Sequence, residues 1–215
     1  MRAPALALLL LASAAAGAAP GPMSLFDGKD LAGWTLVTKE GVPIGSVCRV
    51  ATNGTMAVAG RPIGYLLSDM RIRNYRLHAE WRWPAGARKN SNSGFLVFLV
   101  GGPVDRRTWP VCFQIQTKAG RAGDLLPMAG ATFAEPLSTP PGAKTPQRDR
   151  RHPSSERPFG QWNTCDIVCR DGTITCWING VFQNRVTGCR PAAGGIGVQL
   201  EGFPYELRRL ELTPL

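Results

Sequence analysis

Side-chain parity in the segment Trp109–Thr117, WPVCFQIQT, constrains the fold more than any other feature of the chain. Successive side chains of a β-strand point to opposite faces, so the apolar positions 111, 113 and 115 predict one buried face. Gln114 and Gln116 share the opposite face with Cys112 and lie about 7 Å apart along the strand. Two long amides at this spacing suit a hydroxyl-rich ligand, although an ordinary solvated face is the commoner explanation for one half-exposed antiparallel strand.

Strand signals recur along the rest of the chain, and no segment longer than a turn has helical periodicity. Leu77–Trp83 and Gly195–Glu201 alternate apolar and polar residues, which predicts half-buried strands. Phe95–Val100 is apolar on both faces, which is typical of a covered central strand. The leucines beyond position 206 change parity, and a bulge around Arg208 and Arg209 accounts for that change. These short strands with glycine and proline turns predict an all-β fold, a sandwich or jelly roll of two antiparallel sheets.

The first 19 residues match a secretory signal peptide. A positive charge at Arg2 precedes the apolar run Leu6–Leu11 and the small residues of Ala14–Ala19, so we expect cleavage near position 18 or 19. The apolar run is short for a membrane span and no second one follows, although a retained N-terminal anchor helix is the alternative. We therefore expect a secreted or periplasmic protein, with one domain over residues 24–215 and no membrane span in the mature chain.

The formal net charge of +10 raises the question of a nucleic-acid partner. The basic residues are scattered, and the densest cluster, Arg148–His152, lies in a proline-rich segment of about residues 134–160. An exported chain rarely meets nucleic acid, so we expect a solvated basic surface and no nucleic-acid partner. Because long irregular segments often border functional sites, we expect residues 134–160 to form a flexible loop beside one.

The cysteine pattern leaves two alternatives open. The chain has six cysteines, at positions 48, 112, 165, 169, 176 and 189. A two-residue hairpin turn at Asp171-Gly172 places Cys169 opposite an isoleucine, and Cys176 likewise, so neither faces another cysteine directly. Buried thiols and disulfide bridges both remain compatible with an exported protein. No spacing of cysteine and histidine suits a metal ion, so we expect no metal site.

Carboxylates are the remaining candidates for catalysis, because the chain has only two histidines and no GxSxG motif. Asp124 follows the amide-bearing strand, and Glu201 shares the polar parity of its own strand with Gln199. We expect Asp124 and Glu201 to act as acid and base. Trp81 and Trp83 have the apolar parity of their strand and are expected in the core. The residues expected to bind a small carbohydrate are Arg82, Trp109, Gln114, Gln116 and Gln199.

Several segments together carry a family resemblance from about Ser24 to Leu215. They include SLFDGKDLAGW, GRPIGYLLS, LHAEWRWP, NSNSGFLVFLV, WPVCFQIQ, GQWNTCDIVCRDGTITCWING and GGIGVQLEGFPYELRRLELTPL. The chain resembles the 3-keto-disaccharide hydrolase domain. That resemblance implies a concanavalin-like jelly roll in an exported bacterial protein that acts on glycosides whose sugar is oxidised at C3, with no metal or other cofactor required.

The implied chemistry is elimination followed by addition of water. A ketone at C3 acidifies the proton at C2, so a base at C2 and an acid at the leaving oxygen can expel the aglycone. Family members often carry an acid in a Glu-x-Gln motif where this chain has Gln114, and an amide cannot act as a base. Either Asp124 and Glu201 supply the acid and base, or the domain is a non-catalytic carbohydrate-binding module. A structural surface domain is the third hypothesis.

Overall fold

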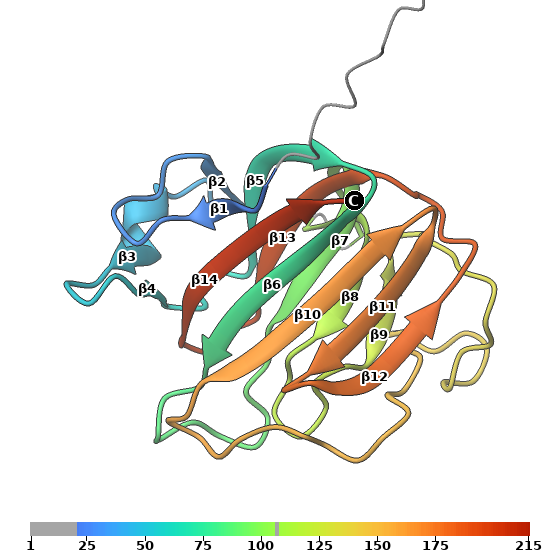
Figure 1. Ribbon diagram of the computed structural model, residues 1–215. Helices are drawn as coiled ribbons and strands as arrows, with labels where there is room; N and C mark the ends of the chain where they lie inside the picture. Colours follow the sequence, from blue (N-terminus) through green and yellow to red (C-terminus); the bar gives the residue numbers. More distant parts are fainter. Residues whose placement is uncertain (1–20, 106–107) are drawn as a thin grey trace, which may run out of the picture.

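Two antiparallel sheets packed face to face form the body of the protein in a computed structural model that describes residues 21–105 and 108–215 (Figure 1). The predicted signal peptide lies outside these residues. The strands are β1 (Met23–Phe26), β2 (Trp34–Thr38), β3 (Cys48–Val50), β4 (Met56–Val58), β5 (Gly64–Ile72), β6 (Tyr75–Arg82), β7 (Gly94–Asp105), β8 (Trp109–Gln116), β9 (Leu125–Met128), β10 (Asn163–Arg170), β11 (Thr173–Ile178), β12 (Val181–Val186), β13 (Gly194–Leu200) and β14 (Tyr205–Pro214).

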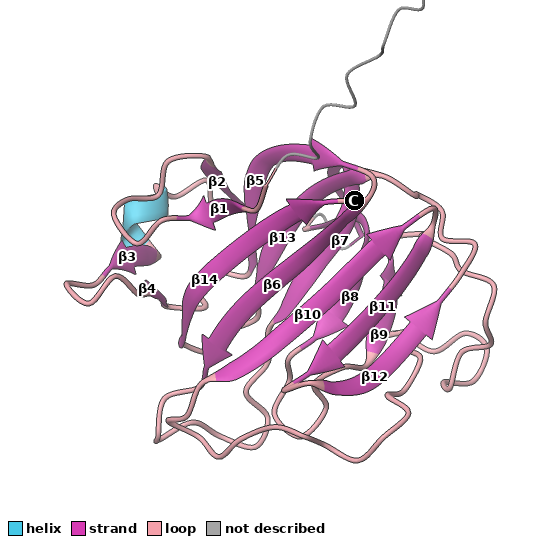
Figure 2. Cartoon of the chain, in the orientation of Figure 1, coloured by secondary structure: helices cyan, strands magenta, loops and turns pink. Residues whose placement is uncertain are grey.

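The sheets differ in size and order. The eight-stranded sheet runs β12-β11-β10-β6-β14-β4-β3, with β1 also paired to β14, and the six-stranded sheet runs β2-β5-β13-β7-β8-β9. A single turn of 3-10 helix at Ile44–Ser46 is the helical element among the described residues (Figure 2). No helix in this part of the chain has the length and apolar character needed to cross a membrane. The predicted all-β jelly-roll sandwich is confirmed.

The core fills the space between the sheets. Trp81 and Trp83 are buried there, as their parity predicted, and Trp81 meets Phe95 of the opposite sheet edge to face, with ring centroids 6.2 Å apart. Phe113 and Ile115 of β8 join the same core, as predicted for the apolar face of that strand. Full burial of one such side chain contributes about 1.5 to 3 kcal/mol, so the alternating strands account for most of the stabilisation.

β7 is covered on both faces, as its double apolar pattern predicted. Phe95 packs into the core between the sheets, whereas Leu96 and Leu99 pack with Tyr65 and Trp109 in a second, smaller cluster on the outer face of the six-stranded sheet. This second cluster forms the apolar base beside which the polar residues of β8 and β13 lie.

The structure contains both the β-bulge and the hairpin turn that the sequence predicted. The register of β14 against β6 shifts after Arg208, and Arg209 has a φ of 50°, which confirms the predicted bulge. Asp171 and Gly172 both have positive φ, at 47° and 71°, as the predicted two-residue turn requires. Cys169 pairs with Ile174 across this hairpin.

All six cysteines are free and buried. Of the two alternatives open from the sequence, the structure therefore has buried thiols. Burial raises the pKa of Cys48 to about 12, and it acts in the same direction on the other five thiols. These side chains behave as small apolar groups of the core and the second cluster, with little thiolate character at neutral pH.

The proline-rich segment 134–160 is held against the sandwich, in contrast to the flexible loop that we expected. Arg148 and Leu125 exchange two backbone hydrogen bonds of 2.8 and 2.9 Å, and the Arg151 N–H donates to the Gln183 carbonyl at 2.7 Å. Residues distant in sequence thus satisfy the backbone groups of this irregular segment, which local composition alone cannot predict.

Candidate functional site

Three neighbouring strands of the six-stranded sheet bring the polar residues of the site together. β7 lies between β13 and β8, with Phe95 opposite both Val198 and Ile115. At the next position Gly94 of β7 pairs with Gln116 of β8, and continuing the β13–β7 register by one residue from Val198 and Phe95 brings Gln199 to the other side of Gly94. The glycine has no side chain, so the amides of the two outer strands can approach each other above it.

A chain of hydrogen bonds links four side chains across this face. The Gln114 Nε2 donates to Gln116 Oε1 at 2.5 Å and to Gln199 Oε1 at 2.8 Å. The Gln199 Nε2 in turn donates to Glu201 Oε2 at 2.9 Å and to Gln114 Oε1 at 3.4 Å. We call this series, Gln116–Gln114–Gln199–Glu201, the amide chain. It orients the Glu201 carboxylate from one side.

The glutamines of the amide chain are buried, although they lie on the outer face of their sheet. Gln114, Gln116 and Gln199 are only 2, 5 and 3% exposed, so this face is not the ordinary solvated face that one strand alone suggested. Buried amides are stable only when their polar groups are paired, and here they pair largely with one another. The hydrogen bonds of the Gln114 amide group are directed to Gln116 and Gln199, which leaves Gln116 and Glu201 at the two ends of the chain.

Gly94 is needed for this arrangement. A Cβ atom at this position would lie 2.7 Å from Gln114 Cγ and 2.8 Å from Gln114 Nε2, closer than side-chain atoms tolerate. Ser93, the residue before it, donates from its hydroxyl to the Gln199 carbonyl at 2.7 Å, and the Tyr205 hydroxyl donates to the same oxygen at 2.8 Å. The backbone around the amide chain is therefore fixed from both sheets.

A cavity of about 870 Å³ opens over the amide chain. All three predicted amide residues, Gln114, Gln116 and Gln199, line it, together with Glu201 and Trp109. Residues 143–147 of the proline-rich segment form part of its wall, so that segment does border the site as expected. A cavity of this size with convergent polar groups is typical of a small-molecule site.

Asn92 and Lys118 extend the site by one more register position. Backbone bonds from Thr117 to Ser93 (3.0 Å) and from Ala119 to Ser91 (2.9 Å) continue the β7–β8 pairing and set Asn92 opposite Lys118. Both residues line the cavity, as does Glu201 from the β13 side. An acid and an ammonium group therefore flank the same stretch of the cavity.

Trp109 is placed as expected at the start of β8, but it is largely packed. Its ring is 5% exposed and belongs to the second cluster with Tyr65, Leu96 and Cys112. The exposed part of the side chain lines the cavity. Trp109 thus supplies an apolar edge to the site and does not stand clear of it as a free stacking platform.

Asp124 does not join the cavity, although we expected it to act as acid or base. Its carboxyl group is fully buried, 2.5 Å from Arg121 Nε and 3.7 Å from Arg150, and it accepts the Arg150 backbone N–H at 2.9 Å. Burial raises the pKa of Asp124, and the Arg150 N–H and the Arg121 guanidinium oppose that shift. These contacts fit a structural anchor for the proline-rich segment, and they do not fit the predicted acid/base role.

Arg82 is also separated from the amide chain. It lies on β6 in the other sheet, where its Nε donates to Glu206 Oε2 and its guanidinium lies 4.7 Å from the centre of the Trp162 ring. Alternation along β6 correctly predicted that Arg82 faces outward. It could not predict that β6 belongs to the sheet opposite Gln114, so the structure does not bring Arg82 together with the other expected sugar-binding residues.

Sequence reasoning missed six polar residues that line the cavity: Asn92, Asp105, Lys118, Lys144, Thr145 and Gln147. Lys118 continues the parity of Gln114 and Gln116 beyond the end of β8, and that signal could have identified it. Lys144 lies in the proline-rich segment, where no periodicity exists. Within residues 21–105 and 108–215, no group of three His, Cys, Asp or Glu side chains is arranged to hold a metal ion.

Comparisons with known proteins agree with this architecture. A protein from Parabacteroides distasonis assigned as a glycosyl hydrolase superposes with a TM-score of 0.65 at 16% identity, over 91% of this chain and 94% of that one. A carbohydrate-binding module, CBM66 from Bacillus subtilis, gives 0.57 at 8% identity, over 84 and 95%. LamAcat from Zobellia galactanivorans gives 0.53 at 8%, over 84 and 90%.

At these identities the solved structures establish a shared fold, and a search of the curated proteins finds no match. The family comparison establishes the family as well as the fold, because one family model covers almost the whole described chain. Residues 21–213 match the model of the 3-keto-alpha-glucoside-1,2-lyase-like domain, and the chain belongs to that family.

Proposed function

We propose that this chain is an exported enzyme that cleaves glycosides whose sugar ring carries a ketone at C3, by elimination across C1 and C2. The observation that carries this proposal is the Glu201 carboxylate at the end of the buried amide chain, inside a cavity of about 870 Å³. Membership of the lyase-like family and the folds of carbohydrate-active neighbours support a carbohydrate as the ligand.

Glu201 is the base in this proposal. Its carboxylate removes the C2 proton, which the C3 ketone has made acidic, and the electron pair of that C–H bond passes first to the C3 oxygen as an enolate. The pair then forms the C1–C2 double bond while the C1–O bond breaks and the aglycone leaves with a proton from cavity water. Addition of water across the double bond completes net hydrolysis.

Lys118 stabilises the enolate oxygen. Lys118 lies just past the end of β8 and Glu201 just past the end of β13, and both line the cavity with Asn92. A sugar ring held between the two groups places C2 near Glu201 and O3 near Lys118. An ammonium group aimed at a developing negative charge in a partly enclosed site is worth several kcal/mol of barrier reduction, of the order of 2.7 to 4 kcal/mol for one oxyanion donor.

The glutamines bind the sugar and position neighbouring side chains, and they do not exchange protons with the substrate. Gln116 ends the amide chain on the substrate side and can bind a sugar hydroxyl, whereas Gln114 acts as a positioning residue because its hydrogen bonds are directed to its two neighbours. The amide at Gln114 is therefore compatible with catalysis, because the proposed base is Glu201 on a different strand.

A non-catalytic carbohydrate-binding module is the second candidate, and the likeness to CBM66 favours it. The test incubates purified protein with 3-keto-trehalose and with trehalose and measures released sugar. The enzyme proposal expects release from the ketone alone, and a loss on the order of 10²-fold or more for Glu201→Gln. Binding of the keto-sugar without release would favour the binding module. Equal release from both sugars would point to a conventional two-carboxylate glycosidase and refute the elimination.

A further inference from the structure

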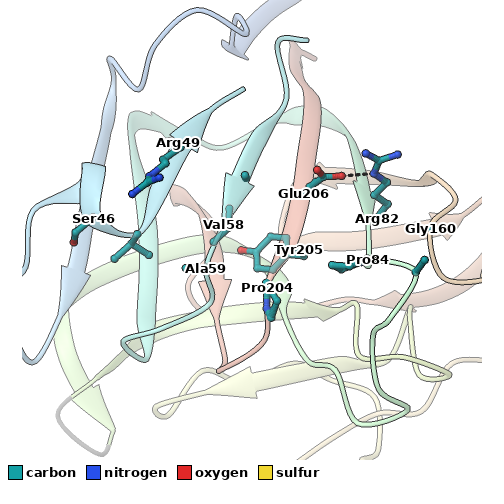
Figure 3. Close-up of a pocket in the computed structure, with 13 residues that line it drawn as sticks. Ser46, Arg49, Val58, Ala59, Arg82, Pro84, Gly160, Pro204, Tyr205 and Glu206 are labelled. Carbon is teal, nitrogen blue, oxygen red and sulfur yellow. Dashed lines mark hydrogen bonds and ion pairs between the residues drawn. The ribbon is translucent and has the colours of Figure 1, made fainter. Parts of the chain in front are cut away.

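A second cavity, of about 660 Å³, lies on the outer face of the eight-stranded sheet (Figure 3). Its centre is a row of cross-strand neighbours on β6, β14, β4 and β3: Arg82 pairs with Glu206, Glu206 with Ala57, and Ala57 with Arg49. Adjacent strands lie about 4.8 Å apart, so the backbones of Glu206 and Arg49 are about 10 Å apart, and the small side chain of Ala57 leaves a hollow between their side chains.

The two walls of this hollow carry different charged groups, and Figure 3 shows Arg49 on one side and the Arg82–Glu206 pair on the other. On one wall the Arg82–Glu206 ion pair is fixed, because the Arg82 guanidinium also lies over the Trp162 ring, whose centre is 4.2 Å from Arg208. On the other wall Arg49 is exposed, and its guanidinium has no hydrogen bond or ion pair with any residue that the structure describes. One unpaired cation therefore faces a paired carboxylate across the hollow.

Between the walls the surface is apolar. Ala59, Pro84, Ala85 and Pro204 line the hollow, and the hydroxyl of Tyr205 is directed away to the Gln199 carbonyl, 2.8 Å distant. Small apolar side chains of this kind accept the C–H face of a pyranose ring. A guanidinium binds a carboxylate through two parallel N–H bonds, and the Glu206 carboxylate can accept hydroxyl hydrogens.

We propose that this cavity binds an acidic sugar, with the carboxylate of a hexuronate on Arg49, its hydroxyls on Glu206 and its ring on the apolar surface. A neutral sugar leaves Arg49 unpaired, and sulfate has no hydroxyl hydrogen to donate to the Glu206 carboxylate. The site is separate from the amide chain and does not depend on the reaction proposed there.

The experiment measures binding of glucuronate, glucose and sulfate to the full chain at neutral pH by ligand-detected NMR. Glucuronate should bind at least tenfold more tightly than glucose or sulfate. Arg49→Gln should weaken glucuronate binding at least tenfold, and Ala57→Leu, which fills the hollow, should abolish it. Arg185→Gln is the matched control, because Arg185 is an exposed arginine on β12 at the far edge of the same sheet.

Three results would overturn the proposal: glucose binding as tightly as glucuronate, sulfate binding as tightly as glucuronate, or glucuronate binding that Arg49→Gln leaves unchanged. Urea denaturation of each variant identifies any loss of fold. Because Arg49 is exposed and makes no hydrogen bond or ion pair with a described residue, we expect Arg49→Gln to unfold at the same midpoint as the parent protein. Gln116→Ala should leave glucuronate binding unchanged, which separates this cavity from the amide-chain cavity.

Discussion

Replacing Gly94 with alanine puts a methyl carbon where the amide chain crosses β7. The new Cβ would lie 2.7 Å from Gln114 Cγ, 2.8 Å from Gln114 Nε2 and 2.9 Å from the Ile115 carbonyl oxygen. Gln114 is only 2% exposed, so its side chain cannot move aside without leaving Gln116 and Gln199.

Two effects set the size of the loss. Overpacking in a tightly packed region costs about 1 to 3 kcal/mol. Each hydrogen bond that Gln114 gives up contributes about 0.5 to 1.5 kcal/mol. We therefore expect Gly94→Ala to lower the free energy of unfolding by about 2 to 5 kcal/mol, and to weaken binding of a keto-sugar because Glu201 loses its support.

Urea denaturation of Gly94→Ala and of a matched control, Gly86→Ala, measures this effect. A Cβ at Gly86 meets no atom within 4 Å, so the control should change stability by less than about 1 kcal/mol. If both variants unfold at the same urea concentration as the parent protein, Gly94 does not make room for the amide chain and the reasoning fails.

Four further predictions follow from other contacts. Gln116→Ala should weaken keto-sugar binding by about 1 to 2 kcal/mol, with little change in the rate at saturating substrate, as measured by steady-state kinetics. A large fall in that rate would show that Gln116 takes part in the chemical step. Asp124→Asn should lower stability by about 3 to 5 kcal/mol and leave the rate of the folded enzyme within a few-fold, whereas a 10²-fold loss would support its predicted acid/base role. The His78–Asp166 hydrogen bond of 3.0 Å raises the pKa of His78 and lowers that of Asp166. The stabilisation by this pair should therefore fade as pH rises above about 6.5 and as pH falls below about 4. His78→Gln should flatten the pH dependence of the urea midpoint, and an unchanged profile would show that the pair does not stabilise the fold. Export predicts a mature N-terminus between about positions 18 and 24, which Edman sequencing of exported material tests against a retained Met1.

Strand identity and strand faces were predictable from the sequence because alternation is local. The core positions of β8, the double burial of Phe95–Val100, the bulge at Arg209 and the turn at Asp171 all follow from residues within one strand or one hairpin. Each is a short-range pattern of side-chain parity or turn chemistry, and each holds in the structure.

Strand order was not predictable, because it depends on contacts between residues far apart in the chain. Parity places Arg82 and Gln114 on outward faces equally well, and only the sheet order puts them on opposite sides of the sandwich. Asp124 is missing from the cavity for a similar reason. One partner, Arg121, is three residues away, but the other, Arg150, is 26 residues away in a segment without periodicity, so no local pattern reveals that the carboxylate is enclosed and buried.

The central claim is that Glu201 starts an elimination across C1 and C2, and solvent deuterium tests it most directly. In D2O, elimination followed by addition of water places one deuterium at C2 of the released sugar, because the C2 proton leaves and solvent supplies its replacement. Mass spectrometry of the product, corrected for exchange of substrate incubated with Glu201→Gln, measures that label. We predict about one deuterium at C2 for each turnover, and released sugar that retains its original C2 hydrogen would contradict the account.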